Sequence, residues 1–210
     1  MQFLAMKRTG MRGSQRFFTT FMSTLKVKNV KKRGKQTKIA QNQIEVGRKI
    51  LKKAIEALNR AIVKTVNVDG STSQSVTIET ALNLIAAHKT LEQYDKALTW
   101  VDTAFTQKLR PFDHAKFLVN QGNIYYELGR KQKSEHNKEK AQYYSKAETS
   151  YRKAIKVYSH NLKARINLAS ILWITGHLDE AIIIYQEVLL IDPSNAYAKK
   201  NLQKLQKIKQ

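Results

Sequence analysis

The sequence has no cysteine, only two prolines and only eight glycines among its 210 residues. The absence of cysteine excludes disulfide bonds, zinc sites with thiolate ligands and thiol chemistry, and it fits a reducing compartment. The scarcity of proline and glycine favours long helices with few turns. No apolar run approaches the roughly 20 residues of a membrane-spanning helix. Hydrophobic residues make up 42% of the chain, which is enough for the core of one domain with an appended arm.

Acidic residues are also scarce, and the beginning of the chain has none. The whole sequence has 38 Lys and Arg against 16 Asp and Glu, a net charge of +22. Residues 1–44 contain 11 basic residues, and Glu45 is the first carboxylate. The remaining 166 residues contain 27 basic and 16 acidic residues. A basic arm on a moderately basic body predicts a polyanionic partner, which is RNA, DNA or an anionic membrane.

Residues 162–195 contain the clearest pattern in the sequence. Small and large apolar residues recur there at offsets that fit two antiparallel helices joined by a tight turn. Ala169 and Ala181 are small enough for the helices to approach closely, and Gly176 allows a left-handed conformation after the first helix. Pro193 is expected to end the second helix. The residues that carry the pattern are Leu168, Ala169, Leu172, Gly176, Ala181, Tyr185 and Pro193.

This stretch resembles a tetratricopeptide repeat, although Arg165 stands where that family usually has a large aromatic residue and Val188 where it usually has Ala. The resemblance implies an all-α fold: a short tetratricopeptide-type solenoid of helical hairpins, with about three repeats, flanking helices and an extended basic N-terminal arm. It also implies a concave face, lined by the first helix of each repeat, that binds protein partners. Such repeats serve many unrelated partners, so the resemblance specifies architecture more closely than role.

The rest of the chain can be divided in register with this repeat. Residues 1–38 are expected to be a basic arm or targeting segment, and residues 39–210 the solenoid. The predicted parts of the solenoid are a capping helix or half-repeat at 39–66, repeats at 78–111, 115–161 and 162–195, and a C-terminal cap helix at 196–208, with a polar loop at 67–76.

The second repeat is longer than the others. It has 13 residues more than a 34-residue repeat, and the surplus near residues 130–142 is expected to lengthen both helices and their turn. Tyr126, Tyr143 and Tyr144 are less constrained by the pattern, and the last two lie near this insertion. The residues predicted to pack this repeat are Leu118, Gly122, Tyr125, Ala147, Tyr151 and Ala154.

The first 25 residues resemble a mitochondrial presequence, since they are amphipathic, rich in Arg, Ser and Thr, and free of acids. The apolar residues at helical spacing are Phe17, Phe18, Phe21, Met22 and Leu25. The resemblance predicts the mitochondrial matrix. Residues 26–38 contain seven Lys or Arg in thirteen positions and are expected to be an extended or RNA-bound linker, although a nuclear localisation signal would look similar.

Signatures of catalysis are absent from the sequence. It has no glycine-rich phosphate loop, no His-Glu-x-x-His and no nucleophile elbow, and its five histidines do not pair at ligand spacing. We therefore predict no catalytic residue, no metal site, no cofactor and no small-molecule substrate.

The first helices of the repeats supply polar residues that could contact a ligand on the concave face. In one version of the family that face clamps a C-terminal carboxylate with Lys, Asn and Arg at set positions. Asn120 and Lys163 match those positions. Leu82, Ala86 and Asn167 do not, so a clamp of this kind is not expected. The concave-face candidates are Asn120, Asn123, Lys163 and Asn167.

Together these features predict a structural subunit of a mitochondrial ribonucleoprotein, with the mitochondrial ribosome the obvious candidate. The solenoid would dock on neighbouring proteins, and the basic arm would contact the phosphates of rRNA. The alternative is a protein–protein adaptor, an assembly factor or a supernumerary subunit of a respiratory complex, and a third reading places the 14–26 segment on an anionic membrane. The predicted phosphate contacts are Arg8, Arg12, Arg16, Lys26, Lys28, Lys31, Lys32, Arg33, Lys35 and Lys38.

Overall fold

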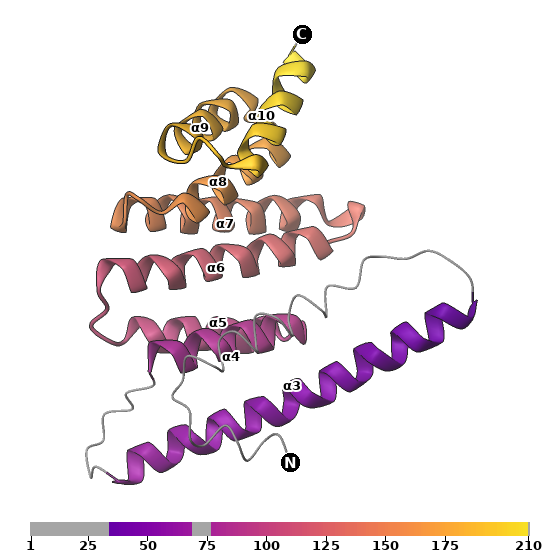
Figure 1. Ribbon diagram of the computed structural model, residues 1–210, viewed down its shortest axis with the longest axis vertical. Coiled ribbons are helices and arrows are strands. Elements are labelled where there is room, and N and C mark those ends of the chain that lie inside the picture. The colour runs from indigo at the N-terminus through magenta and orange to yellow at the C-terminus, as the bar shows by residue number, and fades with distance from the viewer. Residues whose placement is uncertain (1–33, 69–76, 210) are drawn as a thin grey trace. The chain divides into compact units, whose positions relative to one another are not determined.

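The computed structural model describes residues 34–68 and 77–209, and every regular element in these ranges is a helix (Figure 1). This agrees with the all-α fold class that the sequence predicts. The elements are α3 Gly34–Val68, α4 Ile78–Thr90, α5 Tyr94–Phe105, α6 Pro111–Lys131, the short 3₁₀ helix η1 Ser134–His136, α7 Asn137–Val157, α8 Leu162–Ile174, α9 Leu178–Ile191 and α10 Ala196–Lys209. None of these helices is both long and apolar enough to cross a bilayer.

Helix α3 begins earlier than the sequence suggests. Its first residue is Gly34, so residues 34–38 are helical and do not continue the extended linker that was predicted up to residue 38. Lys and Gln, which dominate this segment, have good helix propensity, and a run of like charges does not outweigh it. Leu51 and Ile55 are buried while Lys52 and Lys53 are exposed.

The helices from α4 to α10 stack in chain order. The pairs α4–α5, α6–α7 and α8–α9 are antiparallel hairpins, and each hairpin packs on the next, with α10 packed on α9 (Figure 1). Three apolar clusters follow one another along this stack, and each draws its residues from adjacent helices. Contacts mainly between near neighbours are the defining property of a solenoid, and the helices from α4 to α10 have this property.

Most of the predicted packing residues are inside this stack. Tyr125 is half-buried, and Gly176 and Pro193 lie exposed in turns. The buried ones are Leu118, Gly122, Ala147, Tyr151, Ala154, Leu168, Ala169, Leu172, Ala181 and Tyr185.

The turns show how the sequence ends each helix. Gly176, between α8 and α9, has φ of 86°, the left-handed conformation predicted for it. Glu92 occupies the matching turn between α4 and α5 with φ of 61°, a strained value for a residue with a side chain. Asn161 and Asn195 cap α8 and α10, since their side-chain oxygens accept the backbone N–H groups of Ala164 and Ala198 at 3.0 Å.

The insertion lengthens both helices of the second hairpin. Helices α6 and α7 have 21 residues each, against 12 to 14 in α4, α5, α8 and α9, and they extend beyond the α4–α5 hairpin (Figure 1). Because of this extension Gly129, which matches Gly176 in register, lies inside α6 and not in a turn. Helix α6 also begins at Pro111, before the predicted start of the repeat at residue 115, because Pro is well suited to the first turn of a helix.

Two glycines bring α6 and α7 close together. A Cβ atom on Gly122 would lie 2.5 Å from Cε1 of Tyr151, and one on Gly129 would lie 2.6 Å from Cε1 of Tyr144. Real Cβ atoms do not approach other atoms so closely, so the tyrosine rings occupy space that only glycine leaves free. Tyr144 is therefore a core residue, which corrects its description as less constrained, and burial raises its pKa.

A buried carboxylate sits at the start of α6. Asp113 is only 2% exposed, and it accepts hydrogen bonds from Arg110 Nε at 2.8 Å and Lys116 Nζ at 3.3 Å. Burial acts to raise the pKa of Asp113, but these two cations outweigh it and hold the pKa below its ordinary value. The positive end of the helix dipole also favours an anion in this first turn.

We expect Asp113→Asn to lower the free energy of unfolding by about 1–3 kcal/mol at neutral pH. The folded pKa lies below the unfolded value of about 3.9, so the carboxylate stabilises the fold fully above the unfolded pKa. That stabilisation is lost as the pH falls through the folded pKa, and the two proteins should then converge. Urea denaturation at pH 7 and near pH 2 measures this difference, with exposed Asp102→Asn as the control. A deficit that is equal at both pH values would contradict the assignment.

Candidate functional site

Two of the predicted concave-face residues are bonded to each other. Oδ1 of Asn123 on α6 accepts hydrogen bonds from Nδ2 of Asn167 on α8 at 2.8 Å and from the Tyr151 hydroxyl on α7 at 2.9 Å. The three side chains tie three successive helices together. Tyr151 is 3% exposed, and burial strongly raises its pKa. Asn123 and Asn167 therefore hold the hairpins in register, and part of their hydrogen-bonding capacity is already used.

The same arrangement recurs one repeat later. The Tyr185 hydroxyl on α9 lies 2.9 Å from Ser170 Oγ on α8 and accepts a hydrogen bond from Asn201 Nδ2 on α10 at 3.2 Å. Tyr185 follows Tyr151 by one 34-residue repeat, and Asn201 follows Asn167 by the same interval. Asn201 is 7% exposed and was absent from the predicted site residues, although this spacing would have identified it.

The first hairpin lacks this connection. At the positions that correspond to Tyr185 and Ser170, the first hairpin has Val101 and Ala86. Neither of these side chains can form a hydrogen bond. Asn120 on α6 donates instead to the carbonyl oxygen of Lys116 within its own helix, at 3.0 Å. Of the four concave-face candidates, Lys163 is the one with an exposed side chain.

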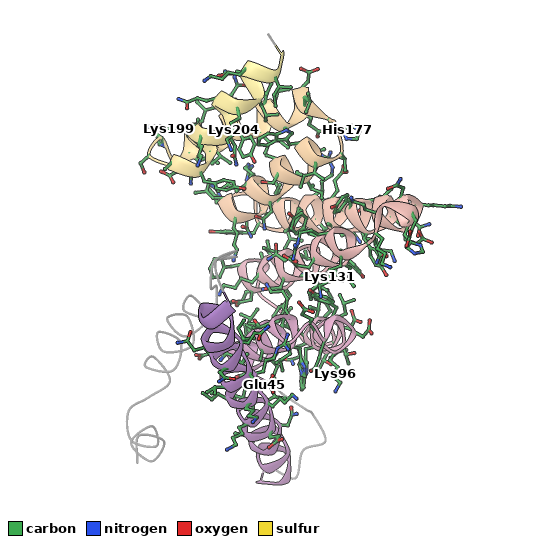
Figure 2. The ribbon with its side chains drawn as sticks, turned by 90° about the vertical axis from the view of Figure 1, so that its right-hand side faces the viewer. Glu45, Lys96, Lys131, His177, Lys199 and Lys204 are labelled. Atoms are coloured by element: carbon green, nitrogen blue, oxygen red, sulfur yellow. The ribbon has the colours of Figure 1, made fainter. Side chains whose placement is uncertain are left out.

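Charge is divided unevenly among the described helices. Helix α10 contains five lysines and no acid, whereas residues 161–195, which include α8 and α9, contain two basic and four acidic residues. Lys199 and Lys204 lie on α10, on the opposite side of this end of the stack from His177 (Figure 2). Lys199, Lys200, Lys204 and Lys207 are all exposed. The basic charge at this end of the stack is therefore concentrated on α10 and not on the hairpin beside it.

The predicted phosphate contacts lie almost entirely outside the described residues. Lys35 and Lys38 are part of α3, but their side chains are not described. The predicted contacts that fall outside the described ranges are Arg8, Arg12, Arg16, Lys26, Lys28, Lys31, Lys32 and Arg33, and the polar loop predicted at 67–76 lies outside them from residue 69.

The histidines and acids of the described residues form no cluster of three or more that could hold a metal ion. His88 is the one buried histidine there, and its Nδ1 lies 2.8 Å from Oε1 of Gln93. His136 lies 3.7 Å from Glu139 on the exposed insertion. His177 precedes α9, and its Nδ1 lies 3.0 Å from the hydroxyl of Thr175. These contacts are local, and each lies within one turn or between adjacent turns.

Comparison with known proteins identifies the repeat. Residues 140–205 match the family model of the tetratricopeptide repeat. The TPR domain of Arabidopsis OM64 is 20% identical, with a TM-score of 0.49, over 62% of this chain and 94% of that one. The first TPR of Spaghetti (RPAP3), bound to an HSP90 peptide, is 20% identical, with a TM-score of 0.50, over 63% of this chain and 95% of that one. The second TPR domain of human RPAP3, in complex with an HSP70 peptide, is 21% identical, with a TM-score of 0.48, over 60% and 92%. No curated protein matches the sequence.

Proposed function

We propose that this chain, whose residues 140–205 match the tetratricopeptide repeat, is a non-catalytic interaction subunit. Specifically, we propose a structural component of a mitochondrial ribonucleoprotein, with the mitochondrial ribosome the best candidate. The fold typically serves as a scaffold for protein partners. The observation that carries the ribonucleoprotein assignment is the concentration of basic charge in separate parts of the chain. Residues 1–44 and α10 contain 16 of the 38 basic residues and none of the acidic ones.

Two basic segments on one interaction scaffold suit a large RNA. Lysine and arginine neutralise phosphates whatever the base sequence, and each contact releases counterions, so several together give a strong and salt-dependent affinity. The hairpins between the two segments, residues 77–195, contain 16 basic and 13 acidic residues. That near balance fits docking on neighbouring proteins, and it leaves the phosphate contacts to residues 1–44 and α10.

The fold is the only support for a protein as the partner of the hairpins. The Spaghetti repeat domain holds an HSP90 peptide, and we carry over from it only the idea that a protein segment is bound. Leu82 and Ala86 supply no polar group where a carboxylate clamp needs one, and Asn167 is already bonded to Asn123. A chaperone tail is therefore not the partner we propose.

The experiment that tests this function is fractionation of mitochondria on a sucrose gradient, with mass spectrometry of each fraction and of the protein's N-terminus. We expect the protein to sediment with a ribosomal subunit, to be released by ribonuclease, and to leave the particle as salt is raised. Sedimentation with respiratory complexes, unaffected by ribonuclease, would contradict the proposal. Loss of this presequence-like N-terminal segment in those fractions would then favour the adaptor or assembly-factor alternative, because the segment would act only as an import signal.

A further inference from the structure

Helix α10 has one side buried against the stack and the other side exposed. Ala198 and Leu205 have no exposed surface and belong to the cluster that α10 shares with α7, α8 and α9, and Asn201 is 7% exposed. Residues three, four and seven apart lie on one side of a helix, so the opposite side faces solvent. Helix α10 contains no acidic residue, so that side has no carboxylate of its own. The Lys and Gln side chains exposed there are Lys199, Lys200, Gln203, Lys204, Gln206 and Lys207.

Three of these lysines form a row along the helix. Lys204, labelled in Figure 2, follows Lys200 by four residues and Lys207 follows it by seven, so all three lie on one face. We call these three residues the α10 row. Seven residues span about 10 Å of helix axis, and one strand of a nucleic-acid duplex carries about three phosphates over that length. The row therefore offers one cation for each of three successive phosphates.

The charges of the α10 row are not neutralised by neighbouring acids. Two acids of the adjacent α9 pair with arginines of α7 and α8, namely Glu180 with Arg152 at 2.8 Å and Glu187 with Arg165 at 3.3 Å. Asp192, which follows α9, interacts electrostatically with Lys199, and we leave Lys199 out of the row for this reason. In the part of the chain that the structure describes, no lysine of the row forms an ion pair. All three cations can therefore serve an anionic partner.

From this row we propose that α10 binds the phosphate backbone of a nucleic-acid duplex, which is RNA in the proposed particle. The inference rests on the proposed function and deepens it, since it names the contacting residues of α10 and the form of the RNA. Lysine binds phosphates whatever the base sequence. Exposed Gln203, three residues after Lys200, lies on the same side and can donate to phosphate or sugar oxygens.

A duplex suits this surface better than a single strand does. Proteins that bind single strands without sequence preference stack successive bases on aromatic side chains. Tyr197 is the single aromatic residue of α10, and its hydroxyl lies 3.4 Å from Oγ of Ser170. One aromatic side chain at the start of the helix is not a series of stacking positions. The row therefore offers contacts to a backbone, whose phosphates a duplex holds at regular intervals.

Two other classes of anionic partner fit α10 less well. A helix that binds a membrane surface needs a continuous apolar face against the lipid, and the apolar side of α10 is buried in the stack. Its large exposed apolar residues, Tyr197 and Ile208, lie near opposite ends of the helix. Protein interfaces are depleted of lysine and centre on buried apolar or Arg anchors, and the α10 row contains no such anchor.

Variants of the full chain isolate the row. The Gln variant replaces all three lysines of the α10 row with Gln, and the Arg variant replaces them with Arg, which keeps the charge. The matched control removes the same net charge from exposed positions of α5 and α7, by Lys96→Gln, Lys153→Gln and Lys156→Gln. Lys, Gln and Arg have similar helix propensities, so circular dichroism and the thermal midpoint should change no more than for ordinary surface substitutions.

The probe is an RNA duplex of about 20 base pairs, long enough for several phosphate contacts. Fluorescence anisotropy over a series of KCl concentrations measures its binding to the full chain. In the Gln variant the slope of log affinity against log salt should fall in magnitude by about 3, close to one for each lysine. The affinity at physiological ionic strength should fall at least about tenfold. The Arg variant should keep the slope of the unmodified protein, and the control should change it by less than about 1.

The same series with a single strand of equal length tests the form of the RNA. Its slope should change by less than about 1 in the Gln variant, because a flexible strand does not hold three phosphates along the row. An equal change of slope for the two probes would exclude the preference for a duplex.

Other results would overturn the site itself. An unchanged slope in the Gln variant, or an equal fall in the control, would show that α10 makes no particular phosphate contacts. Vesicles of phosphatidylserine and phosphatidylcholine provide the membrane test. If they bind the unmodified chain and not the Gln variant, while the duplex slope is unchanged, the row belongs to a membrane contact.

This experiment and the gradient experiment can fail separately. An unchanged duplex slope in a protein that still sediments with a ribosomal subunit would remove the α10 site and leave the proposed function. Sedimentation away from ribosomal subunits, with the change of slope present, would remove the proposed particle and leave a duplex-binding helix.

Discussion

Replacing Tyr185 with Ala is expected to lower the free energy of unfolding by about 3–5 kcal/mol. Tyr185 has no exposed surface and is the largest of the fully buried side chains in the described residues. Its ring packs in the cluster shared by α7, α8, α9 and α10, so its removal leaves a cavity at the contact of four helices. Its hydroxyl also holds Ser170 and Asn201, and Asn201 would be left buried without this acceptor. Urea denaturation followed by circular dichroism measures the loss.

The conservative variant separates packing from hydrogen bonding. Tyr185→Phe keeps the ring and removes the hydroxyl, and we expect a cost of about 1–2 kcal/mol because the Asn201 amide loses its acceptor. Tyr197→Phe is the matched control. That residue is 54% exposed and its hydroxyl lies 3.4 Å from the same Ser170, so its loss should change stability by less than about 0.5 kcal/mol. Equal effects of the two Phe variants would show that the Tyr185 hydroxyl does not join the repeats.

Gly122→Ala is expected to destabilise the protein by about 1–3 kcal/mol, although Ala is the better helix former by about 1 kcal/mol. The new methyl group would lie 2.5 to 2.9 Å from three atoms of the Tyr151 ring. The ring cannot move aside easily, because it is 3% exposed and its hydroxyl donates to Asn123. The two effects have opposite signs, so the sign of the measured change decides whether close packing or helix propensity dominates here.

A double-mutant cycle tests the cause of this cost. In a Tyr151→Leu background the ring is absent, and Gly122→Ala should lose at least about 1 kcal/mol of its cost. Chemical denaturation of the four proteins gives the coupling free energy between the two positions. If Gly122→Ala is as costly without the ring as with it, the close approach of α6 and α7 is not set by this contact.

The architecture of this protein was largely predictable, because it depends on intervals along the chain. Ala169, Gly176 and Ala181 recur at the offsets of a helical hairpin, and the 34-residue period placed the surplus of the second repeat between its helices. The structure has the hairpin, the left-handed Gly176 and the two lengthened helices. Patterns of this kind reflect which face of a helix is buried and where a helix must stop, and both are local requirements.

The candidate sites were less predictable, because the role of a polar residue depends on what packs against it. Asn123, Asn167 and Lys163 look equivalent in the sequence, as polar residues on first helices. In the structure Asn123 accepts hydrogen bonds from Asn167 and from Tyr151, and of these three polar residues only Lys163 remains exposed. Nor did the sequence indicate which of the clustered apolar residues of α9 would face solvent. Leu190 is 83% exposed, while Val188 is buried.

By itself the sequence determined the all-α class, the repeat register, the position of the insertion and the uneven distribution of charge, since each follows from composition and spacing along one chain. Only the tertiary structure decided that Gly122 accommodates the Tyr151 ring, that Asn123 bonds to a side chain 44 residues away, and that α9 exposes large apolar side chains. The physical reason is that these properties belong to pairs of side chains from different helices. Their separation in space is set by how the hairpins stack, and neither residue specifies it alone.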